Sequence, residues 1–202
     1  MAVFHRRQHL GKDYFMEHVL DVKKLVNELT LEEKASLCSG ADFWHTKAID
    51  RLNIPAAMVS DGPHGIRKQE SLADHMGVAE SIKAIGFPTA SAMACSFDRD
   101  LLHKVGDALG EECVAEDLAV LLGPGINMKR SPICGRNFEY YSEDPVVAGE
   151  LGAAFVNGVQ EHGVGTSLKH FAANNQEWRR MSISAEIDDC LLYTSPSPRD
   201  CS

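Results

Sequence analysis

The sequence lacks a long hydrophobic run, a cluster of basic residues and a secretory leader, and each absence excludes a class of protein. No apolar stretch approaches the roughly 20 residues that a membrane-spanning helix needs, so we expect no membrane partner. The formal net charge is −9 without a Lys/Arg run, which argues against a nucleic-acid partner. The first 15 residues contain no apolar signal segment, and we therefore expect a cytoplasmic protein.

Motifs for metals, disulfides and nucleotides are also missing. The six cysteines have no short paired spacing, which is typical of free thiols in a reducing compartment. No C-x-x-C occurs, and we predict no metal site. Neither a G-x-G-x-x-G nor a phosphate-loop spacing is present, and we expect no cofactor.

What is present is the composition of a soluble α/β domain. The chain has 202 residues, of which 44% are hydrophobic and 24% charged, enough for one domain with a core. Four apolar segments are predicted strands: 56–61, 86–91, 118–128 and 164–174. Amphipathic helical segments lie between them, and this alternation indicates parallel βαβ units.

The helix starts carry recognisable capping signals. Thr30 and Glu33 form a capping box for a helix that should end at Ser39. Asp98 caps a second helix, and Asp144 followed by Pro145 starts a third. The inward face of the helix after Asp98 is predicted to carry Leu101, Leu102, Val105, Ala108, Leu109 and Cys113. The inward face of the helix after Asp144 is predicted to carry Val147, Leu151, Ala154, Phe155 and Val159.

Polar residues gather directly after three of the predicted strands, at 61–67, 127–139 and 169–180. In a parallel barrel all strand carboxyl ends meet on the face that carries the active site. An open doubly wound sheet would cluster them in a similar way. The pattern therefore predicts that these loops share one pocket.

Several of these residues also have simpler explanations. Asp61 could make an Asx-turn before Pro63, and Arg67 could form a surface ion pair. Arg136 lies in "GRNFEYYSEDP", where charge and aromatic rings suit a sugar; alternatively it pins its own loop through Glu139.

The segment "SLKHFAANNQEWRR" is the most unusual. Lys169 and His170 are adjacent at a strand end, where alternation would send their side chains to opposite faces. A lone buried lysine is costly without a partner. The alternatives are a hydrogen-bonded core histidine for His170, and a solvated helix start for Arg179 and Arg180.

Four motifs, in order and spacing, resemble the N-terminal barrel domain of family 3 glycoside hydrolases, in particular the β-glucosidases. They are "LTLEEKASLCSG", "SDGPHGIR", "GPGINMKRSPICGRNFEYYSEDP" and "LKHFAANNQEWRR". The resemblance covers residues 22–189. A 1–21 extension and a 190–202 tail, which resembles the translation of a sequencing adapter, lie outside it.

The resemblance implies an α/β fold: the N-terminal half of a (β/α)8 barrel, incomplete here, which an α/β sandwich domain would follow. It implies retaining hydrolysis of terminal β-D-glucosyl residues from a β-glucoside or oligosaccharide. It also implies a non-trans peptide between Lys169 and His170. The sugar-binding positions that match the family are Asp61, Arg67, Arg136, Lys169, His170 and Arg180.

The catalytic carboxyl groups are not among these residues. Retaining hydrolysis needs two carboxyl groups about 5 Å apart. In the family the nucleophilic Asp and the acid/base lie in later segments, so we expect a truncated fragment that is inactive alone. The loop "KHFAANNQE" departs from the "KHFPGHG" type of the N-acetylglucosaminidase branch. The alternatives are a β-xylosidase or another family 3 exo-glycosidase, and a Schiff-base lyase that uses Lys169.

Overall fold

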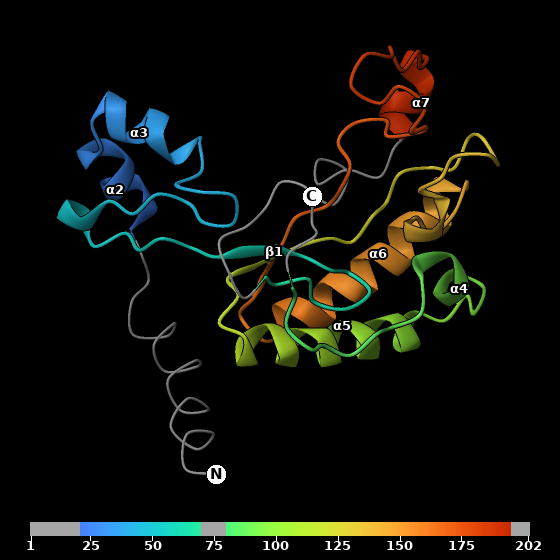
Figure 1. The fold of residues 1–202 in the computed structure, drawn as a ribbon, viewed down its shortest axis with the longest axis horizontal. Coiled ribbons are helices and arrows are strands. Elements are labelled where there is room, and N and C mark those ends of the chain that lie inside the picture. The colour runs from blue at the N-terminus through green and yellow to red at the C-terminus, as the bar shows by residue number, and fades with distance from the viewer. Residues whose placement is uncertain (1–20, 70–79, 195–202) are drawn as a thin grey trace, which may run out of the picture.

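The structure, a computed structural model, describes residues 21–69 and 80–194. Helices separate its three strands along the chain (Figure 1). The helices are α2 (Val22–Glu28), α3 (Leu31–Leu37), α4 (Ala90–Ala94), α5 (Arg99–Ala115), α6 (Pro145–Gln160) and α7 (Asp189–Thr194), with 3₁₀ turns η1 (Asp50–Leu52) and η2 (Asn137–Glu139). The strands are β1 (Val59–Asp61), β2 (Val120–Leu122) and β3 (Gly165–Thr166).

The three strands form one parallel sheet in the order β1-β2-β3. Ser60 pairs with Leu121, and Leu121 pairs with Thr166. Both connections between neighbouring strands contain helices, as parallel pairing requires. The predicted α/β class is confirmed, although each strand is shorter than the apolar run that predicted it.

The predicted helix starts are confirmed by their caps. The Thr30 hydroxyl accepts from the Glu33 amide, and the Glu33 carboxylate accepts from the Thr30 amide, which completes the capping box. Asp98 accepts from the first amides of α5. Asp144 caps α6, with Pro145 in the first turn.

Helices α5 and α6 lie side by side against the sheet (Figure 1). Leu109 of α5, Leu121 of β2 and Phe155 of α6 are fully buried in one apolar cluster. The two helices approach closely because glycine removes the side chain at the contact. A Cβ at Gly106 would lie 2.2 Å from the Phe155 carbonyl oxygen, and one at Gly158 would lie 2.2 Å from that of His103.

Two expectations about these elements are wrong. The segment 86–91 is not a strand, because the Thr89 hydroxyl caps α4 and the following Ser-Ala-Met-Ala residues continue that helix. Leu101 faces outward, with 40% of its surface exposed, although Leu102 beside it is fully buried. The buried face of α5 therefore begins at Leu102, one residue later than predicted.

The ends of the chain lie largely outside the described residues. This holds for nearly all of the predicted 1–21 extension and for 195–202 of the predicted tail, whose first residues belong to α7. Within 21–69 and 80–194, Cys38, Cys95, Cys113 and Cys134 are free thiols. None of the helices in these ranges combines the length and apolarity needed to cross a bilayer.

Candidate functional site

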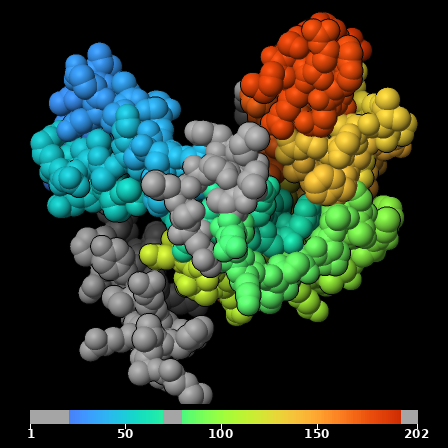
Figure 2. All heavy atoms as spheres, in the orientation of Figure 1, coloured from blue at the N-terminus to red at the C-terminus, as the bar shows by residue number. Residues whose placement is uncertain are grey.

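All six predicted site residues line one open pocket of about 780 Å³ at the carboxyl ends of the strands. They are Asp61, Arg67, Arg136, Lys169, His170 and Arg180. The pocket lining joins residues near the N-terminal helices to residues near the C-terminal segment, and Figure 2 shows a hollow between these two parts of the surface. The prediction that three loops share one pocket is confirmed.

The Lys169 ammonium lies at the centre of the charged lining. Its Nζ donates to Asp61 Oδ1 at 2.6 Å and lies 3.7 Å from Glu139 Oε2. The Lys169 side chain is only 14% exposed, so it has the partners that a buried lysine requires. Burial opposes ionisation of Asp61, but the Lys169 charge and hydrogen bond outweigh burial and lower the pKa of Asp61. Asp61 is thus a carboxylate at neutral pH.

The loop after β1 is shaped by two glycines with positive φ angles. Gly62 has φ 127° and Gly65 has φ 132°. A Cβ at Gly62 would lie 2.2 Å from the Gly65 carbonyl oxygen, so the turn requires glycine. The turn closes when the Arg67 amide donates to the Asp61 carbonyl at 2.9 Å. It therefore brings Asp61 and Arg67 to the same pocket.

His170 is held as a neutral imidazole. Arg136 donates to its Nε2 at 2.9 Å, so the ring proton resides on Nδ1, which lies 2.6 Å from the Tyr140 hydroxyl. Burial, together with the Arg136 and Lys169 charges, lowers the pKa of His170 to about 4. The Lys169–His170 peptide is cis, as the resemblance implies.

The simpler explanation for Arg136 holds together with the predicted one. Its Nε donates to Glu139, which pins the loop, while the guanidinium also lines the pocket. Arg180 pairs with Glu177 at 3.5 Å, and it too reaches the pocket lining. Neither arginine is only a surface ion-pair partner.

The sequence analysis noted the aromatic rings of "GRNFEYYSEDP", which include Phe138, but missed the rest of the aromatic side of the pocket. Phe43 and Trp44 line it from the segment before β1, with Phe138 from η2. The Trp44 indole nitrogen donates to Gln69 at 3.3 Å, and its ring meets Phe43 edge to face. The adjacent aromatic pair in "DFW" was the available signal, but nothing in the local sequence places it near Asp61.

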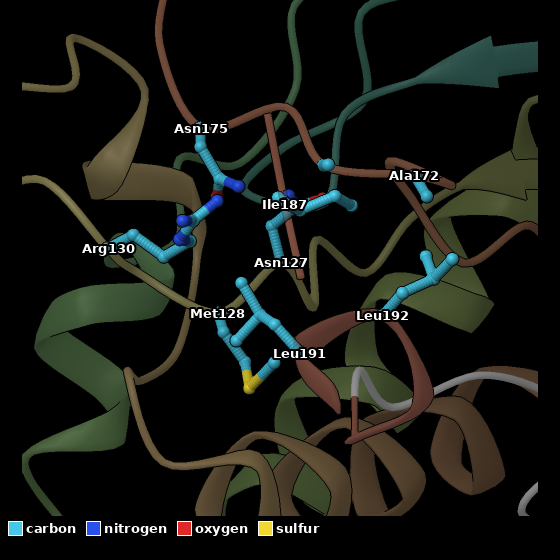
Figure 3. A pocket seen from close by; sticks show the side chains of 9 residues that line it. Asn127, Met128, Arg130, Ala172, Asn175, Ile187, Leu191 and Leu192 are labelled. Carbon is cyan, nitrogen blue, oxygen red and sulfur yellow. The ribbon is translucent and has the colours of Figure 1, made fainter. Parts of the chain in front are cut away.

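A second pocket beside α7 is too small to hold a sugar. Its volume is about 20 Å³, room for about one water. Figure 3 shows the side chains that line it. They include Asn127, Met128, Arg130, Asn175, Ile187 and Leu191. Across the described part of the chain, no three His, Cys, Asp or Glu side chains group as metal ligands would.

The large pocket offers donors and acceptors for hydroxyl groups next to aromatic faces. Asp61 can accept from neighbouring hydroxyls, while the arginines and Lys169 donate. Its two lining carboxylates, Asp61 and Glu139, both face cations. The arrangement is therefore suited to binding a polyhydroxylated ring.

Comparisons with known proteins agree with this geometry. The model of the glycosyl hydrolase family 3 N-terminal domain matches residues 23–178. Thermostable beta-glucosidase B of Acetivibrio thermocellus is 58% identical over 173 residues, which are 86% of this chain and 23% of that protein. An exo-alpha-(1->6)-L-arabinopyranosidase of Bifidobacterium longum is 53% identical over 168 residues, 83% of this chain and 22% of the relative.

Two solved structures are also similar. A GH3 beta-glucosidase from Bifidobacterium adolescentis superposes with a TM-score of 0.72 and 52% identity, over 81% of this chain and 23% of that one. A beta-glucosidase from Kluyveromyces marxianus in complex with glucose gives a TM-score of 0.71 and 44% identity, over 78% and 18%. This chain thus spans less than a quarter of the length of these relatives.

Proposed function

Because this chain belongs to glycosyl hydrolase family 3, we propose that its pocket binds the terminal β-D-glucosyl residue of a β-glucoside. On this proposal the chain supplies the sugar-recognition part of a retaining β-glucosidase. Asp61 accepts hydrogen bonds from two neighbouring hydroxyls, and Lys169 and the lining arginines donate to others.

One observation carries the proposal: six side chains from separate loops converge on a single open pocket. Lys169, with Asp61 on one side and Glu139 on the other, makes the site rigid as well as charged. A preorganised polar site of this kind discriminates strongly against analogues that lack a hydroxyl, often by about 10⁴-fold. Relatives with beta-glucosidase names support glucose as the sugar.

We further propose that the parallel sheet β1-β2-β3 is part of a (β/α)8 barrel, with residues 22–189 as the barrel segment. The two catalytic carboxyl groups of a retaining enzyme would then lie outside the described residues. This fits the pairing of both pocket carboxylates with cations, because the general acid of a retaining enzyme must carry a proton, and an adjacent cation disfavours the protonated form.

The alternatives differ in how well the geometry supports them. A β-xyloside, or the α-L-arabinopyranoside in the name of one relative, presents a similar ring of hydroxyls and would use the same side chains. A Schiff-base lyase is disfavoured, because it needs Lys169 as a free amine nucleophile. Lys169 Nζ is instead held between two carboxylates.

Calorimetric titration of the purified chain with D-glucose tests the proposal. We expect saturable one-to-one binding, with D-xylose weaker because it lacks the hydroxymethyl group. 2-Deoxyglucose should bind at least tenfold more weakly than glucose, because it leaves a pocket donor or acceptor unpaired. Equal affinities for glucose and 2-deoxyglucose, or no binding by a folded chain, would refute the assignment.

A further inference from the structure

Helix α4 lies between two of the loops that form the pocket. On one side it contacts His64, in the loop that carries Asp61. On the other side it contacts η2, whose flanking residue Arg136 and last residue Glu139 line the pocket. Both contacts are hydrogen bonds between segments far apart in the sequence, so each joins a pocket loop to the same short helix.

The first contact satisfies an amide that a helix leaves unpaired. The Ala90 amide begins α4 and has no acceptor within the helix. It donates to His64 Nε2 at 2.9 Å, while the Phe87 amide donates to the His64 carbonyl at 2.9 Å. His64 therefore holds the start of α4 through its side chain and its backbone.

This contact fixes the state of the imidazole. Because Nε2 accepts, the neutral ring carries its proton on Nδ1. Burial and the Lys169 charge lower the pKa of His64. The Glu139 and Asp61 carboxylates oppose this shift, but the net effect is a lowered pKa. The ring remains an acceptor for Ala90 at neutral pH.

The second contact is a directed chain of hydrogen bonds. Lys129 Nζ donates to the Ser91 hydroxyl at 3.1 Å. The Ser91 hydroxyl in turn donates to the carbonyls of Asn137 at 2.8 Å and Phe138 at 3.1 Å. Since Lys129 can only donate, it directs the single hydroxyl proton of Ser91 toward η2.

We propose that α4 is a bracket that sets the spacing between the Asp61 loop and the Arg136–Glu139 loop, with Ser91 as a positioning residue for the sugar and His64, which also lines the pocket, as the attachment on the Asp61 side. The expected effect on sugar binding rests on the proposed function, although the bracket itself is a property of the unliganded chain. A binding site needs its groups held within about 0.5 Å of the productive geometry. Lys169 already joins the two loops through Asp61 and Glu139, and α4 ties them a second time through His64 and Ser91.

The test combines binding with amide exchange. His64→Leu and Ser91→Ala each remove one end of the bracket, and we expect each to weaken glucose binding by about tenfold. The double variant should bind no more weakly than either single one, because either substitution alone already breaks the link through α4. His64→Gln and Ser91→Thr retain the acceptor and the hydroxyl, and they should bind within threefold of the wild-type chain.

Hydrogen exchange in the sugar-free chain separates the bracket from the proposed function. His64→Leu should speed exchange of the Glu139 amide in η2, and Ser91→Ala should speed exchange of the Ala90 amide, each by tenfold or more. His103→Leu, which removes a partly exposed ring that pairs with Glu161 at 3.1 Å, is the matched control and should change neither. Three results would each overturn the bracket. They are faster amide exchange only beside each substitution, additive losses of affinity in the double variant, and conservative variants that do not restore binding. A chain that shows the coupled exchange but binds no glucose keeps the bracket and refutes the sugar site.

Discussion

Lys169 and Asp61 lie 108 positions apart in the sequence, yet their charged groups are joined by a hydrogen bond of 2.6 Å. The same ammonium also lies 3.7 Å from Glu139, so one side chain ties together the loops after β1 and β2. This ion-pair cluster is the electrostatic centre of the pocket. We therefore expect this ion-pair cluster to control both the folding stability of the chain and its affinity for the sugar.

Lys169→Met should destabilise the fold by about 2–4 kcal/mol, because it leaves the largely buried Asp61 carboxylate without its hydrogen-bonded cation, while Glu139 keeps Arg136. The partial exposure of Asp61 places the effect below that of a fully buried pair. Urea unfolding at pH 7 measures it. Lys24→Met is the matched control, since its 3.9 Å contact with Glu28 is exposed and should contribute less than about 0.5 kcal/mol. Equal effects of the two substitutions would show that the cluster adds no stability.

Acid should destabilise the protein through His170. Its folded pKa is about 4, below the ordinary value of about 6.5, so the unfolded chain binds a proton first as pH falls. The stabilisation from His170 is therefore complete above about pH 6.5 and is lost as pH falls toward 4. Between pH 7 and pH 5, the free energy of unfolding of the wild-type chain should fall by on the order of 1–2 kcal/mol more than that of His170→Gln. Parallel pH profiles would contradict this assignment.

Gly106→Ala should cost about 1–3 kcal/mol of folding free energy, because the added methyl would overlap the Phe155 carbonyl and force α5 from α6. Gly149→Ala in α6 is the control. Nothing lies within 4 Å of the methyl it adds, and alanine should stabilise that helix by up to about 1 kcal/mol. Thermal unfolding followed by circular dichroism compares the two. A stabilised Gly106 variant would mean that the helices can separate at no cost.

The purified chain should not hydrolyse an aryl β-glucoside. Both carboxylates that line the pocket are held by cations, so the pocket offers no free carboxylic acid to protonate the leaving group. Release of nitrophenol from p-nitrophenyl β-D-glucoside gives the measurement. Turnover that persists after repeated purification would place the catalytic carboxyl groups within this chain.

Local signals in the sequence predicted the helix starts and the strand-end loops well. Asp98, Asp144 and the Thr30–Glu33 box act over three residues, so the chain alone defines them. The segment 86–91 was mistaken because its apolar residues fit a strand equally well. What decides its structure is a cap by Thr89 and a contact with His64, which lies more than 20 residues away.

The pocket was only partly predictable for the same reason. The six polar site residues lie at or after strand ends, and parallel strands bring their carboxyl ends together. Trp44 reaches the same pocket from a segment without a regular strand, so no periodic pattern could place it there. The role of Ser91 depends on the order of donors from Lys129 to η2, which only the three-dimensional arrangement defines.

Glucose affinity of Asp61→Asn tests the central claim most directly. The substitution keeps the size of the side chain but removes the charge that strengthens hydrogen bonds to sugar hydroxyls, each worth about 1.5–3 kcal/mol. We predict that calorimetry at pH 7 gives a Kd at least 30-fold above that of the wild-type chain. Asp107→Asn, whose carboxylate pairs with His162 between α5 and α6, should leave Kd unchanged. A folded Asp61→Asn chain that binds glucose within threefold of wild type would contradict the account.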